Sequence, residues 1–208
     1  IMTDNATTDF VRGAQDIVHA GQRLDARGWV PATAGNISCR LPDGRIAITR
    51  SGCHKGFLTR NDVITVDMAG QSHQPQDKPS AETLLPSQVY RLLPPAGAVL
   101  HGHSVASTVL SMTEPSPALV LEGYEVQKVF AGQNTHDAAV HVPLFANDQD
   151  IARLAGEVEP FFADMPAGYI IRGHGVYVWG KNMAEALARL EGLEFLLACV
   201  LERRKLGI

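Results

Sequence analysis

Apolar residues recur at helical spacing near the start of the chain and at strand-like spacing after it. The apolar residues at positions 10, 11, 14, 17, 18 and 24 follow helical spacing on one face, which predicts a helix ending near Gly28. After the loop PATAGNIS, the segments SCRL and RIAIT flank Pro42-Asp43-Gly44, a combination typical of a β-hairpin. The run VITVD predicts a third strand. The first third of the chain therefore predicts one helix followed by three strands.

The middle of the chain alternates between helical and extended patterns. The segment AETLLPSQVYRLL predicts a helix in which Pro86 either lies in the first turn or kinks the helix, because a proline further inside removes a hydrogen bond from the ladder. A strand, AVLHGHS, and a helix, VASTVLSM, come next. A short strand near LVL, a helical EVQKVF and a strand AAVHVPLF complete this part of the chain.

The last third of the chain predicts two helices around one long strand. DIARLAGEVEPFF has helical spacing, GYIIRGHGVYVWG favours β-structure throughout, and Asn182 can cap the final helix, MAEALARLEGLEFLLACVLERR. Helices thus bracket the strands, and several strands are joined by hairpins or short loops. This order predicts an α/β fold, a three-layer α/β/α sandwich with a mixed, largely antiparallel central sheet, built as a single domain over residues 1–208.

Composition excludes several classes of partner. The 208 residues are 45% hydrophobic and carry a net charge of -4, with no basic run longer than Arg203-Arg204-Lys205, which argues against nucleic-acid and anionic-membrane binding. No apolar stretch approaches the roughly 18 residues of a membrane span, and the N-terminal residues do not resemble a secretory signal. Three scattered cysteines form no disulfide pattern, so we expect a cytoplasmic location.

The strand AVLHGHS carries two histidines separated by one residue. Side chains at positions i and i+2 of a strand point to the same face, about 6.5–7 Å apart at Cα. His101 and His103 can therefore converge on one metal ion at about 2.1 Å each. The alternative is two ordinary histidines at a strand end, because this spacing is common.

A metal site of this kind needs a third ligand, and the chain offers six further histidines. His174 is favoured because it lies between two glycines in a strongly β-forming segment, where the backbone can bulge or approach another strand closely. The other candidates lie in a helix, in loops or near a strand start: His19, His54, His73, His136 and His141. From the residues alone the third ligand stays open.

Five motifs occur in order along the chain: AGNIS at 34–38, TRSG at 49–52, KPSAE at 78–82, AVLHGHS at 98–104 and RGHGVYVWG at 172–180. This series resembles the class II aldolase/adducin family over nearly the whole chain. The resemblance implies one zinc ion per subunit, held by His101, His103 and His174. It also implies a sugar-phosphate substrate and a homotetramer with sites near the subunit boundaries.

The resemblance also implies a phosphate-binding region made from three loops. Glycine lets the backbone come close to a phosphate, and serine donates a hydrogen bond without bulk. Lys55 can add a positive charge, whereas Ala81 stands where aldolases often have a second serine. The phosphate-binding residues predicted in this way are Gly35, Asn36, Ser51, Gly52, Ser80 and Lys55. The alternative for each is an ordinary turn residue.

Within the family, the chain is most similar to the members that remove water from a methylthio-substituted ketose 1-phosphate in methionine salvage. RGHGVYVWG matches their late motif, and Glu125 lies 22 residues after His103, where these dehydratases have a catalytic glutamate. We therefore expect Glu125 to be a general acid/base near the zinc and partly buried. Glu82 is a second candidate, as a direct catalyst, a fourth ligand or a residue that supports the ligands.

Two other functions stay open. Aldolases and the sugar-phosphate epimerase of the family tend to use a tyrosine near the C-terminus, whereas the last tyrosine here is Tyr177. An aldolase or epimerase acting on another ketose phosphate is nevertheless the nearest alternative. A non-catalytic, adducin-like interaction module is the other alternative, and it predicts damaged metal ligands.

Overall fold

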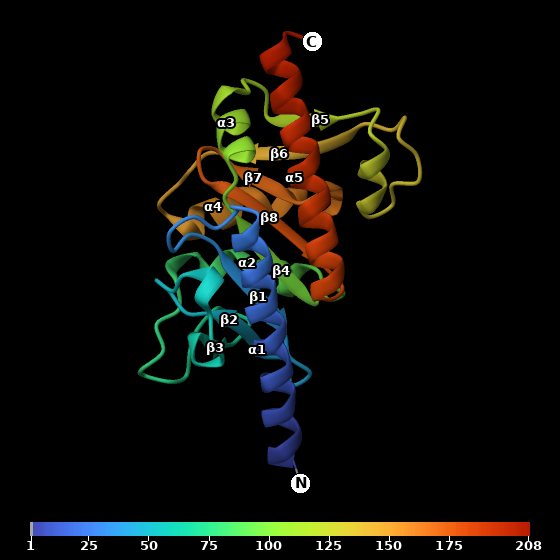
Figure 1. Ribbon diagram of the computed structural model, residues 1–208. Helices are drawn as coiled ribbons and strands as arrows, with labels where there is room; N and C mark the ends of the chain where they lie inside the picture. Colours follow the sequence, from blue (N-terminus) through green and yellow to red (C-terminus); the bar gives the residue numbers. More distant parts are fainter. Residues whose placement is uncertain (1) are drawn as a thin grey trace.

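The computed structural model describes residues 2–208, and one mixed sheet crosses the middle of the molecule (Figure 1). Within that range the sheet has eight strands in the order β3-β2-β1-β4-β8-β7-β6-β5. Only β6 and β7 pair in parallel, so the expectation of a mixed, largely antiparallel sheet is confirmed. The strands are β1 (Asn36–Arg40), β2 (Ile46–Thr49), β3 (Val63–Val66), β4 (Ala98–Gly102), β5 (Ala118–Leu121), β6 (Val140–Phe145), β7 (Tyr169–Ile171) and β8 (Gly175–Gly180).

Helices cover both faces of this sheet, as the three-layer prediction requires. The α-helices are α1 (Met2–Ala26), α2 (Leu84–Leu92), α3 (Val105–Thr113), α4 (Ile151–Val158) and α5 (Met183–Leu206). Short 3-10 turns connect them: η1 (Lys55–Phe57), η2 (Arg60–Asp62), η3 (Ala81–Thr83), η4 (Glu125–Val129) and η5 (Glu159–Asp164). Figure 1 shows α1 and α5 on one face of the sheet, with α2 and α4 behind it.

The two faces of the sheet bury separate hydrophobic cores. One core joins α1, α3 and α5 to the sheet, and the other joins α2, α4 and η5 to the opposite face. Strand β4 contributes to both, because Leu100 belongs to the first core and Val99 to the second. This alternation is the ordinary two-residue period of a strand that is covered on both faces. It places His101 on the α2 side.

Most local predictions are confirmed. The first helix is followed by Gly28, whose φ of 71° is a conformation that glycine adopts freely. β1 and β2 form the hairpin around Pro42-Asp43-Gly44, and Pro86 lies in the first turn of α2. The Asn182 side chain caps α5 by accepting a hydrogen bond from the Glu185 N–H.

The long strand predicted over 168–180 is wrong. The structure divides it into β7 and β8, an antiparallel pair joined by a tight turn at Arg172–His174. Gly173 adopts a φ of 63°, and the His174 N–H donates to the Ile171 carbonyl at 3.1 Å. Arg172-Gly173-His174-Gly175 interrupts the apolar pattern here, and glycines at such a point are compatible with a bulge in one strand as well as with a turn. His174 therefore lies in a turn rather than in a strand.

Two further segments differ from expectation. EVQKVF forms the 3-10 turn η4 instead of an α-helical segment, and β4 ends at Gly102, one residue before His103. No helix among residues 2–208 is long and apolar enough to span a membrane.

Candidate active site

His101 lies at the centre of the sheet, close to the end of β4. In the strand pairing it stands opposite Asn36 of β1 on one side and Tyr177 of β8 on the other. Its side chain is fully buried. A polar ring at this depth requires hydrogen-bonding or ligand partners, because burying an unpaired polar group is unfavourable.

His103 and His174 complete a cluster around His101. One ring nitrogen from each of the three side chains lies within 4.8 Å of the other two. The ring centroid of His101 is 4.4 Å from that of His103 and 5.0 Å from that of His174. Glycine at position 175 allows this approach, since a Cβ there would overlap the carbonyl oxygen of Gly102. The structure thus brings the three histidines together, and their role as ligands stays a prediction.

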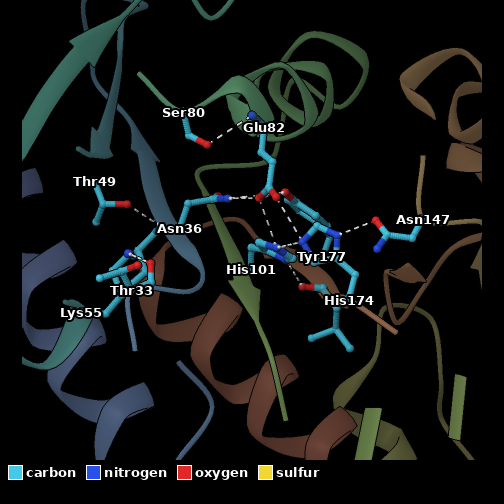
Figure 2. Close-up of polar contacts among 12 residues, drawn as sticks. Thr33, Asn36, Thr49, Lys55, Ser80, Glu82, His101, Asn147, His174 and Tyr177 are labelled. Carbon is cyan, nitrogen blue, oxygen red and sulfur yellow. Dashed lines mark hydrogen bonds and ion pairs between the residues drawn. The ribbon is translucent and has the colours of Figure 1, made fainter. Parts of the chain in front are cut away.

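The hydrogen bonds of two rings leave nitrogens free to bind a cation (Figure 2). His101 Nδ1 lies 2.9 Å from the Val176 carbonyl oxygen, which only accepts, so Nδ1 carries the proton. His174 Nδ1 lies 3.1 Å from Asn147 Oδ1 in a similar arrangement. The two Nε2 atoms are 3.3 Å apart, close to the roughly 3.4 Å between nitrogens held at 2.1 Å by a tetrahedral ion. These residues fit a divalent metal.

Burial favours the uncharged form of two of these rings. Desolvation lowers the pKa of His101, and its contact with Glu82 offsets this only in part. Desolvation also lowers the pKa of His103 to about 3, and the charges of His101 and His174 add to the effect. Neutral imidazole is the form that binds a metal, so neither ring needs to lose a proton at neutral pH.

Glu82 is the carboxylate of the cluster. It lies in η3, whose N-cap Ser80 accepts a hydrogen bond from the Glu82 N–H at 3.3 Å. Its Oε1 lies 3.1 Å from His174 Nε2, and its Oε2 lies 3.4 Å from His101 Nε2. Burial favours the protonated acid, but when the Nε2 atoms of His101 and His174 carry protons, their hydrogen bonds and charges outweigh it and lower the pKa of Glu82 well below its ordinary value. The cluster therefore contains an anionic group beside its imidazoles.

A cavity of about 250 Å³ opens beside this cluster. Glu82 and His103 form part of its wall, and all the residues predicted for phosphate binding line it: Gly35, Asn36, Ser51, Gly52, Ser80 and Lys55. Four further lining residues were not predicted: Thr33, Ala34, Thr49 and Arg50. Arg50 lies inside the TRSG motif, and its positive charge was a feature of the sequence from which a phosphate-binding role could have been predicted. The three loops thus meet next to the histidines.

Lys55 has a different environment from the one expected. Its side chain is buried, and its Nζ donates to the carbonyl oxygens of Thr33 at 2.9 Å and Cys53 at 2.6 Å (Figure 2). Desolvation lowers the pKa of this amine. Thr33 and Cys53 belong to two separate loops around the cavity. Lys55 therefore ties these loops together, in addition to lining the cavity.

Glu125 is not beside the histidines of its own chain. It begins η4, its side chain is 75% exposed, and it pairs with Lys128 Nζ at 2.5 Å, which lowers its pKa. This turn follows β5, which stands four strands from β4, roughly 19 Å at 4.8 Å per strand. The expectation of a partly buried carboxylate near the cluster is wrong for a single chain. The acid–base role of Glu125 stays a prediction.

Two residues that support the cluster were missed in the sequence. Asn147 follows β6 and holds the His174 ring, but no spacing rule connects positions 147 and 174. Tyr177 stacks against the His101 ring at a centroid distance of 4.0 Å and an angle of 10°. Tyr177 belongs to the motif RGHGVYVWG, three residues after His174, so the sequence shows its proximity to that histidine. The sequence does not show its contact with His101, which depends on the pairing of β4 with β8.

Comparison with known proteins agrees with this geometry. The family model described as the class II aldolase and adducin N-terminal domain matches residues 15–201. The chain belongs to this family. Among solved structures, it is similar to the L-fuculose-1-phosphate aldolase of Thermus thermophilus, with a TM-score of 0.76 and 26% identity over 95% of this chain and 98% of that chain.

Curated relatives of higher identity carry one name, methylthioribulose-1-phosphate dehydratase. The protein of Gluconacetobacter diazotrophicus is 66% identical over 97% of this chain and 98% of the relative. The protein of Gluconobacter oxydans is 68% identical over 91% of each chain. The similarity to the dehydratase branch, expected from two motifs, therefore extends over the full length of the family domain.

Proposed function

We propose that this protein is a methylthioribulose-1-phosphate dehydratase of methionine salvage, a hydro-lyase. Its substrate is 5-methylthioribulose 1-phosphate, which has a ketone at C2 and hydroxyls at C3 and C4. The reaction removes the proton from C3 and expels the C4 hydroxyl as water. The resulting enol tautomerises to 2,3-diketo-5-methylthiopentyl 1-phosphate, so carbon, oxygen and charge balance without any oxidant.

The observation that carries this proposal is the position of the three-histidine cluster on the wall of the loop-lined cavity. A ketose phosphate needs two environments a few ångströms apart, one for the ketone and its neighbouring hydroxyl and one for the phosphate. The cluster supplies the first, and the cavity with Arg50, Ser51 and Gly52 supplies the second. Relatives at 66–68% identity select the dehydratase among the family's reactions.

We assign the metal as zinc, one ion per subunit, held by His101, His103 and His174. Three imidazoles suit zinc and leave a position for substrate oxygen, which is the pattern of a catalytic rather than a structural site. When bound, the ion supplies Lewis acidity, which makes the C3 proton easier to remove and stabilises negative charge on the adjoining oxygens. The Nδ1–H of His101 donates to the Val176 carbonyl oxygen, and the Nδ1–H of His174 donates to Asn147 Oδ1. These two hydrogen bonds fix the orientations of the rings.

The phosphate end of the substrate fits the cavity on charge and size. Gly35 and Gly52 both have positive φ values, of 82° and 79°, a backbone conformation that glycine adopts freely, and at Gly35 a Cβ would also overlap the His101 carbonyl oxygen. Ser51 and Ser80 supply hydroxyl donors, Asn36 a side-chain amide, and Arg50 a cation whose buried Nε has no partner among the described residues. We assign the phosphate to this region.

Proton transfer requires a carboxylate that moves a proton at C3 or at the departing hydroxyl. We assign this role to Glu125. Because Glu125 is exposed and far from its own cluster, this assignment requires a second copy of the chain to bring it to the site. An oligomer with sites near subunit boundaries, and specifically a homotetramer, meets that requirement. Glu82 then acts beside the histidines of its own chain, as a ligand or as an oriented anion.

We also propose a cytoplasmic location. All three cysteines are free thiols: Cys39 is buried, and Cys53 and Cys199 are partly buried. Free thiols persist in a reducing compartment.

The deciding experiment offers the purified protein three substrates, 5-methylthioribulose 1-phosphate, L-fuculose 1-phosphate and a ribulose phosphate, and measures metal content in the same preparation. We expect dehydration of the first to the diketone, no comparable cleavage or epimerisation of the others, and one zinc per subunit. Cleavage of a ketose phosphate into two products would instead identify an aldolase. Absence of bound metal together with absence of all three activities would favour an adducin-like interaction module.

A further inference from the structure

Four side chains form a row across the middle of the sheet on the α2 side. Asn36, His101, Tyr177 and Tyr169 stand directly opposite one another on β1, β4, β8 and β7. The ring of His101 stacks on Tyr177 at 4.0 Å and 10°, and Tyr177 stacks on Tyr169 at 5.1 Å and 15°. Both tyrosines are fully buried. His101 is thus supported along one face by a stack of two rings.

The Glu82 carboxylate meets the residues on both sides of His101 in this row. Tyr177 Oη donates to Glu82 Oε2 at 3.4 Å, and Asn36 Nδ2 lies 3.5 Å from the same oxygen (Figure 2). Asn36 Nδ2 also lies 3.4 Å from Tyr177 Oη, so the two donors contact each other. These distances are at the long end of hydrogen bonding, and their effect comes from the convergence of two neutral donors on one oxygen.

Glu82 needs such support because its own segment constrains it weakly. It lies in a three-residue 3-10 turn, and its side chain is 27% exposed on the cavity side. The Tyr177 hydroxyl, by contrast, projects from a central strand between two paired neighbours. A rigid buried donor can fix a more mobile carboxylate, and a buried hydroxyl that bonds a carboxylate oxygen satisfies both groups.

We propose that Tyr177 is a positioning residue of the metal site, whose hydroxyl, together with the Asn36 amide, fixes the Glu82 carboxylate over the histidine cluster while its ring supports His101. The inference deepens the proposed function and rests on the assignment of the three histidines as metal ligands. It assigns Asn36, predicted for phosphate binding, a second task at the metal end of the site. Tyr177 acts through Glu82 and His101 and does not itself contact the substrate.

The row contains a matched control for this idea. Tyr169 is a neighbouring, equally buried tyrosine in the same stack, and its hydroxyl has no hydrogen-bond partner among the described residues. Tyr177→Phe and Tyr169→Phe therefore make the same chemical change at adjacent positions. The first removes a donor to Glu82 and keeps the ring on His101, whereas the second removes a hydroxyl without a partner.

The test measures zinc affinity of the metal-stripped protein by competition with a chromophoric chelator, for the wild type and both variants. We expect Tyr177→Phe to bind zinc about 10- to 100-fold more weakly, the usual effect of removing a group that orients ligands. Tyr169→Phe should bind as the wild type does. In a Glu82→Ala background, Tyr177→Phe should add less than about threefold, because the acceptor is already gone. Thermal unfolding of each apoprotein checks that the variants fold.

Three results would overturn the proposal: unchanged zinc affinity in Tyr177→Phe, an equal loss in Tyr169→Phe, or the full loss persisting in the Glu82→Ala background. If Glu82→Ala fails to fold, Glu82→Gln replaces it. In addition, the spectrum of Co²⁺ bound to Tyr177→Phe, compared with that of the wild type, reports whether the variant changes the coordination of the ion. An unchanged spectrum in Tyr177→Phe would then count against the proposal. No substrate enters these measurements, so failure of the wild type to dehydrate its substrate would overturn the proposed function and leave this test standing.

Discussion

The Nε2 atoms of His101 and His174 lie 3.3 Å apart, although the two residues are separated by 73 positions in the chain. Each ring is turned to this position by its other nitrogen, which bonds Val176 in one case and Asn147 in the other. The pairing of β4 with β8 brings the turn that carries His174 alongside the end of β4. This relationship brings ring nitrogens from two distant motifs close enough to reach a single ion.

Replacing His101 should remove metal and activity together. His101→Ala deletes one of three proposed ligands from a fully buried position, so we expect metal content below a tenth of the wild-type value and turnover reduced by at least about 1,000-fold. Metal analysis and the dehydration assay on one preparation check this. His73→Ala, at an exposed position, is the control and should change neither quantity. Full activity in a metal-free His101→Ala protein would disprove the metal assignment.

Glu125→Gln should separate metal binding from turnover. Its side chain is exposed and far from the cluster of its own chain, so metal content and unfolding temperature should stay unchanged. The proposed loss of a proton-transfer group should lower kcat by about 100- to 10,000-fold. The nearby exposed Glu122→Gln serves as the control and should be active. Normal turnover of Glu125→Gln would show that another group moves the proton.

Mixed oligomers should recover activity if Glu125 acts on a neighbouring subunit. His101→Ala keeps Glu125 and lacks the metal site, whereas Glu125→Gln keeps the metal site. Co-expression of the two with different tags, followed by purification on both, should yield hybrids that are more active than either parent. Activity no greater than that of the parents would mean that Glu125 does not serve a partner's site.

Lys55→Met should loosen the cavity loops. It removes an ammonium and with it two hydrogen bonds from a charged donor, to the Thr33 and Cys53 carbonyls. We expect a loss of about 2 kcal/mol in the free energy of unfolding, or ~4–8 °C in Tm, and a rise in KM that exceeds the fall in kcat. Chemical unfolding and steady-state kinetics measure both. Lys181→Met, at an exposed position, should match the wild type. An unchanged KM would argue against the loop-bracing role.

Glu194 should make the fold less stable as the pH rises through neutrality. This carboxyl is buried in α5, and desolvation raises its pKa from 4.5 to about 7, against a smaller opposing effect of the nearby Ser104 hydroxyl. Between those two pKa values the folded state binds more protons than the unfolded state, so stability falls with increasing pH. The loss is on the order of 3 kcal/mol between pH 4.5 and 8.

Urea unfolding at pH 5 and pH 8 tests this for the wild type, Glu194→Gln and the exposed control Glu202→Gln. We expect the wild type and Glu202→Gln to lose stability over this range, and Glu194→Gln to lose less by about the amount stated. Identical pH dependence in all three proteins would show that Glu194 ionises normally.

Some parts of the fold and of the site could be predicted because they depend on residues that are close together in the sequence. The i, i+2 spacing of His101 and His103, the Pro42-Asp43-Gly44 hairpin and the Asn182 cap each depend on a few neighbouring residues. The turn between β7 and β8 could not be predicted in the same way. Arg172-Gly173-His174-Gly175 separates two apolar runs, and glycines at such a break are compatible with a bulge in one long strand or with a turn between two short ones.

The sequence by itself determined the order of helices and strands, the presence of the family motifs and the residue types available for binding a metal and a phosphate. Only the tertiary structure decided which of them meet. It placed His174 and Glu82 against His101, buried Lys55 between two loops and left Glu125 exposed on a distant edge. The physical reason is that periodicity and turn chemistry act over a few residues, whereas contacts between distant residues depend on which strands pair, and the hydrophobic pattern does not specify that order.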